Sequence, residues 1–124
     1  MKVGVLSGGG DAPGINAVIR AVVRKGILSY GDEMIGIQDG WRGLVENKFI
    51  PLNLKTISGL LPRGGSILGT SRTNPFKREG GPKKVLEITN LNGIDAVVVI
   101  GGDDTLGVAK KMTDLGLNCV GVPK

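Results

Sequence analysis

Two glycine-rich turns, each containing aspartate, constrain what this chain can fold into. They lie at residues 7–11 and 101–105, and each directly follows a short apolar run, at residues 3–6 and 96–100. Each turn also precedes a stretch that has the pattern of a helix. A strand that ends in glycines before a helix presents backbone N–H groups to phosphate. Because the carboxyl ends of parallel strands meet at one edge of a sheet, we expect the two turns to line one crevice. The sequence therefore predicts a phosphorylated ligand.

The rest of the chain alternates between strand and helix patterns. We expect strands at 2–7, 34–37, 96–100 and 118–122, and helices that begin near Asn16, at Pro82 and near residue 104. Apolar residues at helical spacing predict the buried faces of these helices: Ala17, Val18, Ala21, Val22 and Leu28; Val85, Leu86, Ile88 and Leu91; Leu106, Val108, Ala109, Met112 and Leu115. Residues 39–62 give no clear pattern, and residues 70–75 form a polar loop. The alternation predicts an α/β fold with a doubly wound parallel sheet.

Composition limits the classes of partner. The formal net charge is +5, from 16 Lys and Arg against 11 Asp and Glu, which suits anionic ligands. Nucleic acid is not the expected partner, because the few aromatic residues are scattered and no basic run exceeds two residues. The single cysteine, Cys119, excludes an internal disulfide and is expected in a buried strand. No apolar run approaches the length of a membrane span and no signal peptide is evident, so a soluble cytoplasmic protein is expected.

The aspartate pair in the second turn points to a metal-bound phosphate. One aspartate suffices to cap a helix, but Asp103 and Asp104 are adjacent carboxylates that would repel phosphate unless a cation lay between them. Mg²⁺ is the natural cation, held by one carboxylate and the phosphate oxygens. Thr105 offers a hydroxyl or backbone N–H to a phosphate oxygen. Arg72, in the polar loop, is either a solvated surface group or a guanidinium that neutralises phosphoryl charge.

Assembled in order, these motifs resemble those of the phosphofructokinase family along essentially all 124 residues. The segments that carry the resemblance are 4–17, 36–40, 63–65, 69–72, 93–96 and 101–103. The resemblance implies phosphoryl transfer to the 1-hydroxyl of fructose 6-phosphate. It implies that Gly10 contacts the donor phosphate through its backbone, that Arg72 contacts the donor, and that Asp103 is associated with Mg²⁺. Donor phosphate-binding residues are expected to be Gly9, Gly10, Arg72, Gly102, Asp103, Asp104 and Thr105.

Two positions bear on the identity of the donor. Members of the family that use ATP have glycine where this chain has Asp104, and commonly Pro-Gly where it has Pro123 and Lys124. The chain therefore resembles the pyrophosphate-using branch. A carboxylate at position 104 would reject the α-phosphate of ATP by its bulk and charge, and Lys124 would offset that charge and hold pyrophosphate. Asp104, Lys124 and Arg72 are the expected catalytic residues. An ATP-dependent enzyme and a non-catalytic phosphate-binding fragment remain alternatives.

Residues 1–124 are expected to be the N-terminal, donor-binding part of a longer enzyme that forms homo-oligomers when complete. The sequence stops directly after a predicted strand, at the end where such folds place their chemistry. Family members continue beyond Pro123 and Lys124 into a segment that contains the catalytic base. We therefore expect the 124 residues alone to be inactive in phosphoryl transfer.

Overall fold

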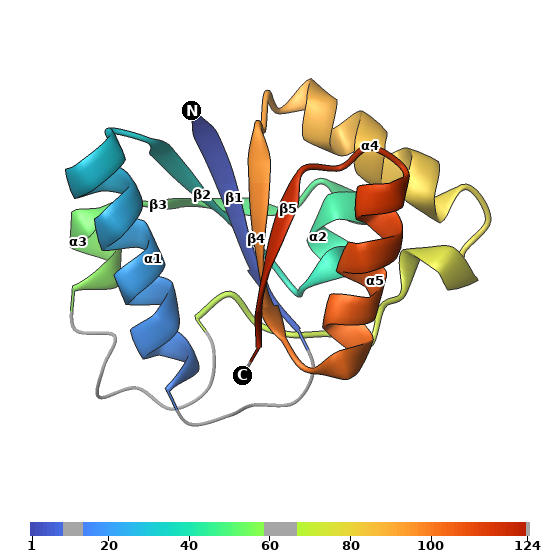
Figure 1. The fold of residues 1–124 in the computed structure, drawn as a ribbon, viewed down its shortest axis with the longest axis horizontal. Coiled ribbons are helices and arrows are strands. Elements are labelled where there is room, and N and C mark those ends of the chain that lie inside the picture. The colour runs from blue at the N-terminus through green and yellow to red at the C-terminus, as the bar shows by residue number, and fades with distance from the viewer. Residues whose placement is uncertain (9–13, 59–66, 124) are drawn as a thin grey trace.

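The computed structural model describes residues 1–8, 14–58 and 67–123. Its centre is a five-stranded sheet with the strand order β3-β2-β1-β4-β5 (Figure 1). The strands are β1 (Lys2–Ser7), β2 (Glu33–Ile37), β3 (Phe49–Leu52), β4 (Ala96–Gly101) and β5 (Cys119–Pro123). The strands predicted at 2–7, 34–37, 96–100 and 118–122 are confirmed, with shifts of one residue at some ends.

The predicted α/β fold with a doubly wound parallel sheet is confirmed, and the structure adds one antiparallel strand, β3, at one edge. Strands β2, β1, β4 and β5 are parallel, but β3 pairs with β2 in the antiparallel direction. The connection from β2 to β3 contains only the short helix α2 (Trp41–Glu46). A parallel crossover needs a longer connection, so the chain turns back along β2. The fold is α/β with a mixed, mostly parallel sheet.

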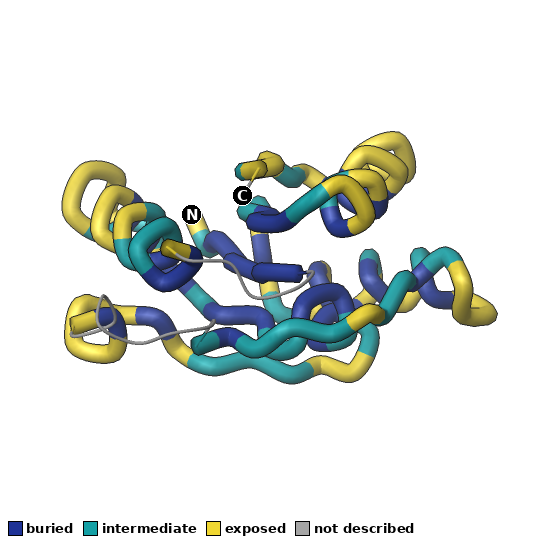
Figure 2. Tube along the Cα trace, turned by 90° about the horizontal axis from the view of Figure 1, so that it is seen from below, coloured by how far each residue is buried: buried dark blue, intermediate teal, exposed yellow. Residues whose placement is uncertain are grey.

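Helices cover both faces of the sheet, as the doubly wound prediction requires (Figure 1). Helices α1 (Ile15–Tyr30) and α3 (Leu54–Ile57) lie on one face, and their apolar residues share a core with β1 and β2. Helices α2, α4 (Gly81–Leu91) and α5 (Asp103–Asp114) share the other core, and the short 3₁₀ helix η1 (Pro75–Lys77) precedes α4. Figure 2 shows the buried residues in the middle layer and the exposed residues on the outer sides of the helices.

The predicted buried faces are confirmed near the middle of the helices and wrong near their ends. Val85 and Ile88 of α4 are buried, as are Val108, Ala109 and Met112 of α5. By contrast, Leu28, Leu91 and Leu115 are at least half exposed. All three lie at or near the carboxyl ends of their helices.

Helix α1 buries a different side than the sequence pattern predicts. Its fully buried stripe is Ile15, Ile19 and Val23, whereas Ala21 is exposed and Ala17, Val18 and Val22 are half-buried. Because apolar residues occur on more than one side of this helix, its sequence pattern does not determine which side meets the sheet. Its predicted C-cap is confirmed: Gly31 has a φ of 65° and its N–H reaches the carbonyls of Gly26 and Ile27.

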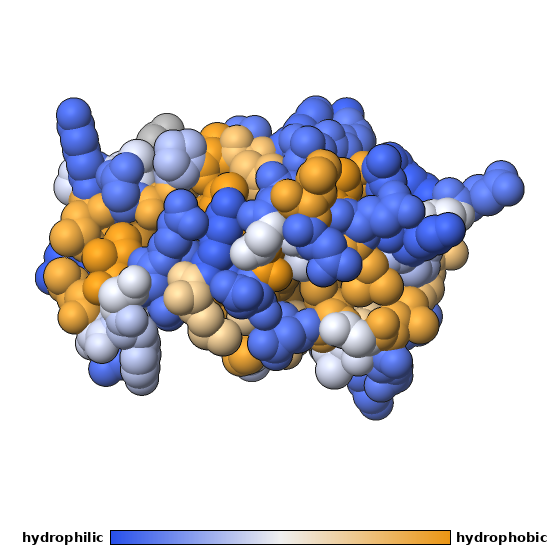
Figure 3. All heavy atoms as spheres, turned by 90° about the horizontal axis from the view of Figure 1, so that it is seen from above, coloured by the Kyte–Doolittle hydropathy of each residue, from blue (hydrophilic) through white to orange (hydrophobic). Residues whose placement is uncertain are grey.

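Cys119 is half-buried, which corrects the prediction of a buried strand residue. It lies on β5, the outermost strand of the described sheet on that side, where Val120 is 58% exposed. The Cys119 thiol donates to the Ala109 carbonyl at 3.3 Å and lies 3.0 Å from the Thr113 hydroxyl. Figure 3 shows that, seen from above, hydrophobic residues reach the surface between hydrophilic ones. None of the described helices is long and apolar enough to cross a membrane.

Candidate functional site

The two glycine-rich turns begin side by side, as predicted. Ser7 at the end of β1 is in register with Ile100 near the end of β4, and the Gly8 N–H donates to the Ile100 carbonyl at 2.9 Å. Gly9 and Gly10, which were predicted to bind the donor phosphate, lie outside the described residues. The described part of the first turn therefore meets the second turn at the carboxyl ends of adjacent parallel strands, where open α/β sheets bind ligands.

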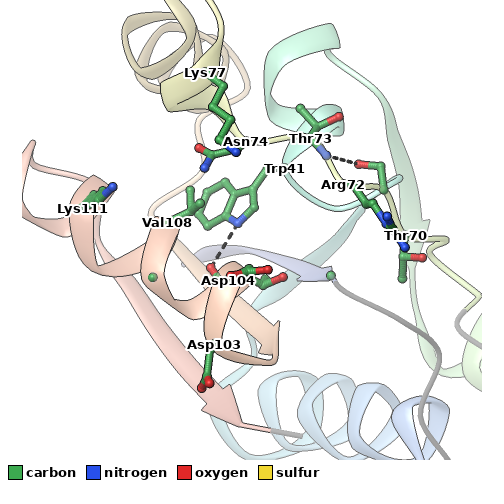
Figure 4. Close-up of a pocket in the computed structure, with 14 residues that line it drawn as sticks. Trp41, Thr70, Arg72, Thr73, Asn74, Lys77, Asp103, Asp104, Val108 and Lys111 are labelled. Atoms are coloured by element: carbon green, nitrogen blue, oxygen red, sulfur yellow. Dashed lines mark hydrogen bonds between the residues drawn. The ribbon is translucent and has the colours of Figure 1, made fainter.

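A cleft of about 870 Å³ opens beside these strand ends (Figure 4). One wall is α5 from Asp103 to Lys111, and the other is the chain from residue 70 to η1. The residues that line the cleft are Gly8, Trp41, Thr70, Ser71, Arg72, Thr73, Asn74, Lys77, Asp103, Asp104, Thr105, Gly107, Val108 and Lys111. Of the predicted site residues that are described, Arg72, Asp103, Asp104 and Thr105 thus share one cleft. Gly102 lies next to it at the start of α5.

The first turn of α5 carries two exposed carboxylates that do not cap the helix. Gly102 is the N-cap residue, and no side-chain hydrogen bond caps the helix there. Figure 4 shows the Asp104 side chain directed into the space between α5 and the Arg72 loop, with Asp103 directed away from Asp104. The helix dipole favours both negative charges at this end. The two carboxylates therefore face different parts of the space around the start of α5.

Thr105 joins the two turns by close packing. Its side chain is 7% exposed, and a Cβ atom added at Gly8 would lie 2.8 Å from its Cγ2 atom. A Cβ atom at Gly101 would lie 2.7 Å from the Thr105 Cβ. Real Cβ atoms do not approach other atoms so closely, so both positions require glycine while Thr105 is present. The Thr105 side chain therefore has a packing role in addition to the predicted phosphate contact.

Hydrogen bonds hold the wall of the cleft that lies opposite α5. Arg72 is exposed in its loop, and the neighbouring Ser71 hydroxyl donates to the Asp39 carbonyl at 2.6 Å. The Thr73 N–H donates to the Ser71 hydroxyl at 3.4 Å. Arg72 thus lies across the cleft from the carboxylates of α5 (Figure 4). This position lets its guanidinium contact an anion bound between the two walls.

The sequence prediction missed three prominent side chains of the cleft. Trp41 is 3% exposed, and its indole N–H donates to the Thr105 carbonyl at 3.3 Å. Lys77 and Lys111 contribute positive charge, and the Lys111 Nζ lies 5.3 Å from the centre of the Phe76 ring. The spacing of positions 104, 108 and 111 predicts that Lys111 lies on the same helix face as Asp104. No comparable signal identified Trp41, because residues 39–62 have no clear pattern.

The described residues could bind a magnesium ion whose other ligands are phosphate oxygens. In residues 1–8, 14–58 and 67–123, no group of three or more His, Cys, Asp or Glu residues could hold a metal by itself. Mg²⁺ typically needs only one or two carboxylates when phosphates and water complete its shell. The exposed Asp103 carboxylate at the start of α5 meets that need. Among the described residues that line the cleft, three cations, Arg72, Lys77 and Lys111, outnumber the two carboxylates, which suits an anionic ligand.

A carboxylate with a clearly shifted pKa lies on α2, outside the residues that line the cleft. A hydrogen bond of 2.6 Å from the Arg42 guanidinium lowers the pKa of Glu46. Glu46 also forms ion pairs with Lys48 and Arg78. This network links α2 to the chain around η1 on the surface.

Comparison with known proteins agrees with this geometry. A family model described as phosphofructokinase matches residues 2–124. The chain is 58% identical to a pyrophosphate–fructose 6-phosphate 1-phosphotransferase from Amycolatopsis methanolica and 47% identical to an ATP-dependent 6-phosphofructokinase from Streptomyces coelicolor. Both alignments cover all of this chain. Each covers 36% of the relative, so the chain spans about a third of these proteins' length.

Solved structures show the same fold. The Pichia pastoris phosphofructokinase in the T-state superimposes with a TM-score of 0.85 at 34% identity, over 98% of this chain and 14% of that one. A pyrophosphate-dependent phosphofructokinase from Marinobacter aquaeolei superimposes with a TM-score of 0.82 at 23% identity, over 99% of this chain and 33% of that one, which bears on the fold alone. Because a phosphofructokinase family model spans residues 2–124 and solved phosphofructokinases share the fold, the chain belongs to the phosphofructokinase family.

Proposed function

We propose that this chain supplies the phosphoryl-donor site of a pyrophosphate-dependent 6-phosphofructokinase, an enzyme of glycolysis. The reaction is phosphoryl transfer from pyrophosphate to the 1-hydroxyl of fructose 6-phosphate, which gives fructose 1,6-bisphosphate and orthophosphate. A new bond forms between the sugar oxygen and phosphorus, and the bond from that phosphorus to the bridging oxygen breaks. The hydroxyl proton goes to a general base.

The observation that carries the choice of pyrophosphate is the position of Asp104. Its carboxylate is directed into the cleft, opposite the Arg72 loop (Figure 4). A nucleotide that binds its terminal phosphates near the glycine turns must continue past this carboxylate, where its α-phosphate meets a like charge. Pyrophosphate ends before that point. The names of similar proteins support the choice: four relatives at 51–58% identity are named for pyrophosphate, and ATP-dependent relatives are 46–47% identical.

The roles of the residues follow from charge and position. Arg72 balances charge on the transferred phosphoryl group, and the backbone N–H groups at the start of α5 orient the phosphate oxygens. Asp103 would hold Mg²⁺, which when bound neutralises the phosphates of the donor. Gly9, Gly10 and Lys124 complete the proposed donor site, although they lie outside the described residues. The complete protein is expected to be a cytoplasmic homo-oligomer that binds neither nucleic acid nor membrane.

The test is a donor assay on the full-length protein that contains this sequence. Formation of fructose 1,6-bisphosphate is measured with Mg²⁺ and either pyrophosphate or ATP. A much higher kcat/KM with pyrophosphate is the expected result. Preference for ATP would instead favour an ATP-dependent enzyme, the second candidate, which the relatives at 46–47% identity support. Binding of pyrophosphate without transfer by the full-length protein would favour a non-catalytic phosphate-binding role.

A further inference from the structure

The turn from Asp39 to Trp41 contacts each of the segments that surround the cleft. It follows β2 and leads directly into α2. Toward β1, the α-carbon of Gly40 packs so closely that an added Cβ would lie 3.1 Å from the Ser7 carbonyl oxygen and 3.8 Å from the Gly8 α-carbon. The turn therefore rests against the strand end that begins the first glycine-rich turn.

The same turn is fastened to the loop that carries Arg72. The Ser71 hydroxyl donates to the Asp39 carbonyl at 2.6 Å, and the Asp39 N–H donates to the Leu68 carbonyl at 2.8 Å. An added Cβ at Gly40 would also lie 3.8 Å from the Ser71 nitrogen. Because Ser71 directly precedes Arg72, these contacts restrict where the guanidinium can reach.

On the other side, the turn is tied to α5 by the Trp41 side chain. The indole N–H donates to the Thr105 carbonyl at 3.3 Å in a buried position (Figure 4). A carbonyl oxygen has two lone pairs, so it can accept this bond in addition to a helix hydrogen bond. Thr105 is the residue after Asp104, so the contact restricts the first turn of α5.

The backbone of the turn has an uncommon conformation that the surrounding contacts hold in place. Asp39 has a φ of 59° and Gly40 has a φ of 63°. A positive φ is uncommon for residues other than glycine, and aspartate is one of the few that tolerate it. A conformation of this kind persists only where surrounding contacts determine it. The hydrogen bonds to Ser71, Leu68 and Thr105 hold the turn in this conformation.

We propose that the turn from Asp39 to Trp41 sets the separation between Arg72 and the first turn of α5, and that Trp41 and Ser71 are positioning residues for the phosphoryl donor. The inference rests on the proposed function, because it assigns the two hydrogen bonds a part in binding pyrophosphate. Neither side chain has to touch the donor. Phosphoryl transfer depends on positioning, so a small change in the width of the cleft reduces the rate or the donor affinity.

The experiment compares two variants of the full-length protein. Trp41→Phe keeps a buried aromatic ring but removes the N–H donor, and Ser71→Ala removes the hydroxyl of a half-buried loop residue. Each loses one hydrogen bond, so kcat/KM for pyrophosphate should fall about two- to twelvefold. The KM for fructose 6-phosphate should stay unchanged, because both contacts lie beside the proposed donor site. Ser71→Thr, which retains a hydroxyl, should restore the wild-type kcat/KM for pyrophosphate.

A matched control separates positioning from general stability. The Thr89 hydroxyl donates to the Val85 carbonyl at 2.7 Å, in a buried part of α4 that does not line the cleft. Thr89→Ala should lower Tm to a similar extent as the two variants but leave kcat/KM for pyrophosphate at the wild-type value.

The outcomes distinguish failure of the inference from failure of the proposed function. A wild-type protein that transfers no phosphoryl group from pyrophosphate contradicts the proposed function, and this inference with it. If the wild type does use pyrophosphate, unchanged donor kinetics in both variants contradict the inference alone. Equal changes in the KM of both substrates, or the same donor effect in Thr89→Ala, also contradict it.

Discussion

Gly8 and Thr105 are in such close contact that a Cβ atom at position 8 would lie 2.8 Å from the Thr105 Cγ2 and nearer still to its hydroxyl oxygen. The contact joins the end of β1 to the first turn of α5. It fixes the relative position of the two glycine-rich turns, which are far apart in sequence. The geometry of the proposed donor site therefore depends on a glycine that need not contact any ligand.

Gly8→Ala should destabilise the protein and weaken donor binding, because the new methyl group displaces Thr105. Overpacking of this kind lowers the free energy of unfolding by about 1–3 kcal/mol. Denaturant unfolding and the KM for pyrophosphate measure the two effects. Adding Thr105→Ala should recover part of the stability. Gly107→Ala is the control for the unfolding measurement alone, because Gly107 lines the cleft; an added Cβ there meets no atom within 4 Å and should stabilise α5 by about 0.5–1 kcal/mol. An unchanged unfolding free energy for Gly8→Ala would contradict the prediction.

Replacing Asp104 and Lys124 with glycine should shift the preference of the full-length enzyme toward ATP. Removal of the carboxylate opens the path of the α-phosphate, and removal of the lysine weakens pyrophosphate binding. The ratio of kcat/KM values for the two donors measures the shift. Asp114→Gly removes a carboxylate at the far end of the same helix and should leave the ratio unchanged. A ratio that does not move in the double variant would refute a role for these residues in donor choice.

Asp103→Ala should reduce turnover far more than stability. Loss of electrostatic stabilisation of the transferred phosphoryl group lowers kcat by about 10²–10³-fold. Loss of one favourable charge at the start of α5 lowers the unfolding free energy by only about 0.3–1 kcal/mol. Activity as a function of Mg²⁺ concentration and thermal unfolding measure the two quantities, with Asp114→Ala as the control. A large loss of stability with a proportionate loss of activity would indicate a structural role.

The Glu46 carboxylate and its ion pairs should stabilise the fold at neutral pH but not in acid. Its pKa is lowered by the hydrogen bond from Arg42, so the folded state binds the proton less tightly than the unfolded state does. The contribution is present above the ordinary pKa of 4.5 and is lost as the pH falls through the lower, folded-state pKa. The Tm of Glu46→Gln should therefore lie below that of the wild type at neutral pH and converge with it in acid. High salt should reduce the difference. A difference that is independent of pH would contradict the ion-pair explanation.

The parts of the fold that were predictable have strong local signals. The apolar runs before the glycine turns identified β1 and β4, and Gly31 and Pro82 correctly marked helix ends. The segment 39–62 was not predictable, because α2, β3 and α3 are each too short to show a clear period. Trp41 lies in that segment, which is why the sequence did not assign it to the cleft.

The sequence by itself determined the residue types of the candidate site: glycine turns after strands, an aspartate pair at the start of a helix, and an arginine in a polar loop. Only the tertiary structure decided that β3 runs antiparallel, that α1 turns Ile15, Ile19 and Val23 toward the sheet, and that Trp41 links α2 to α5. The reason is physical. Backbone preferences act over a few residues, whereas strand direction, helix rotation and cleft width are set by contacts between segments that are distant in the chain.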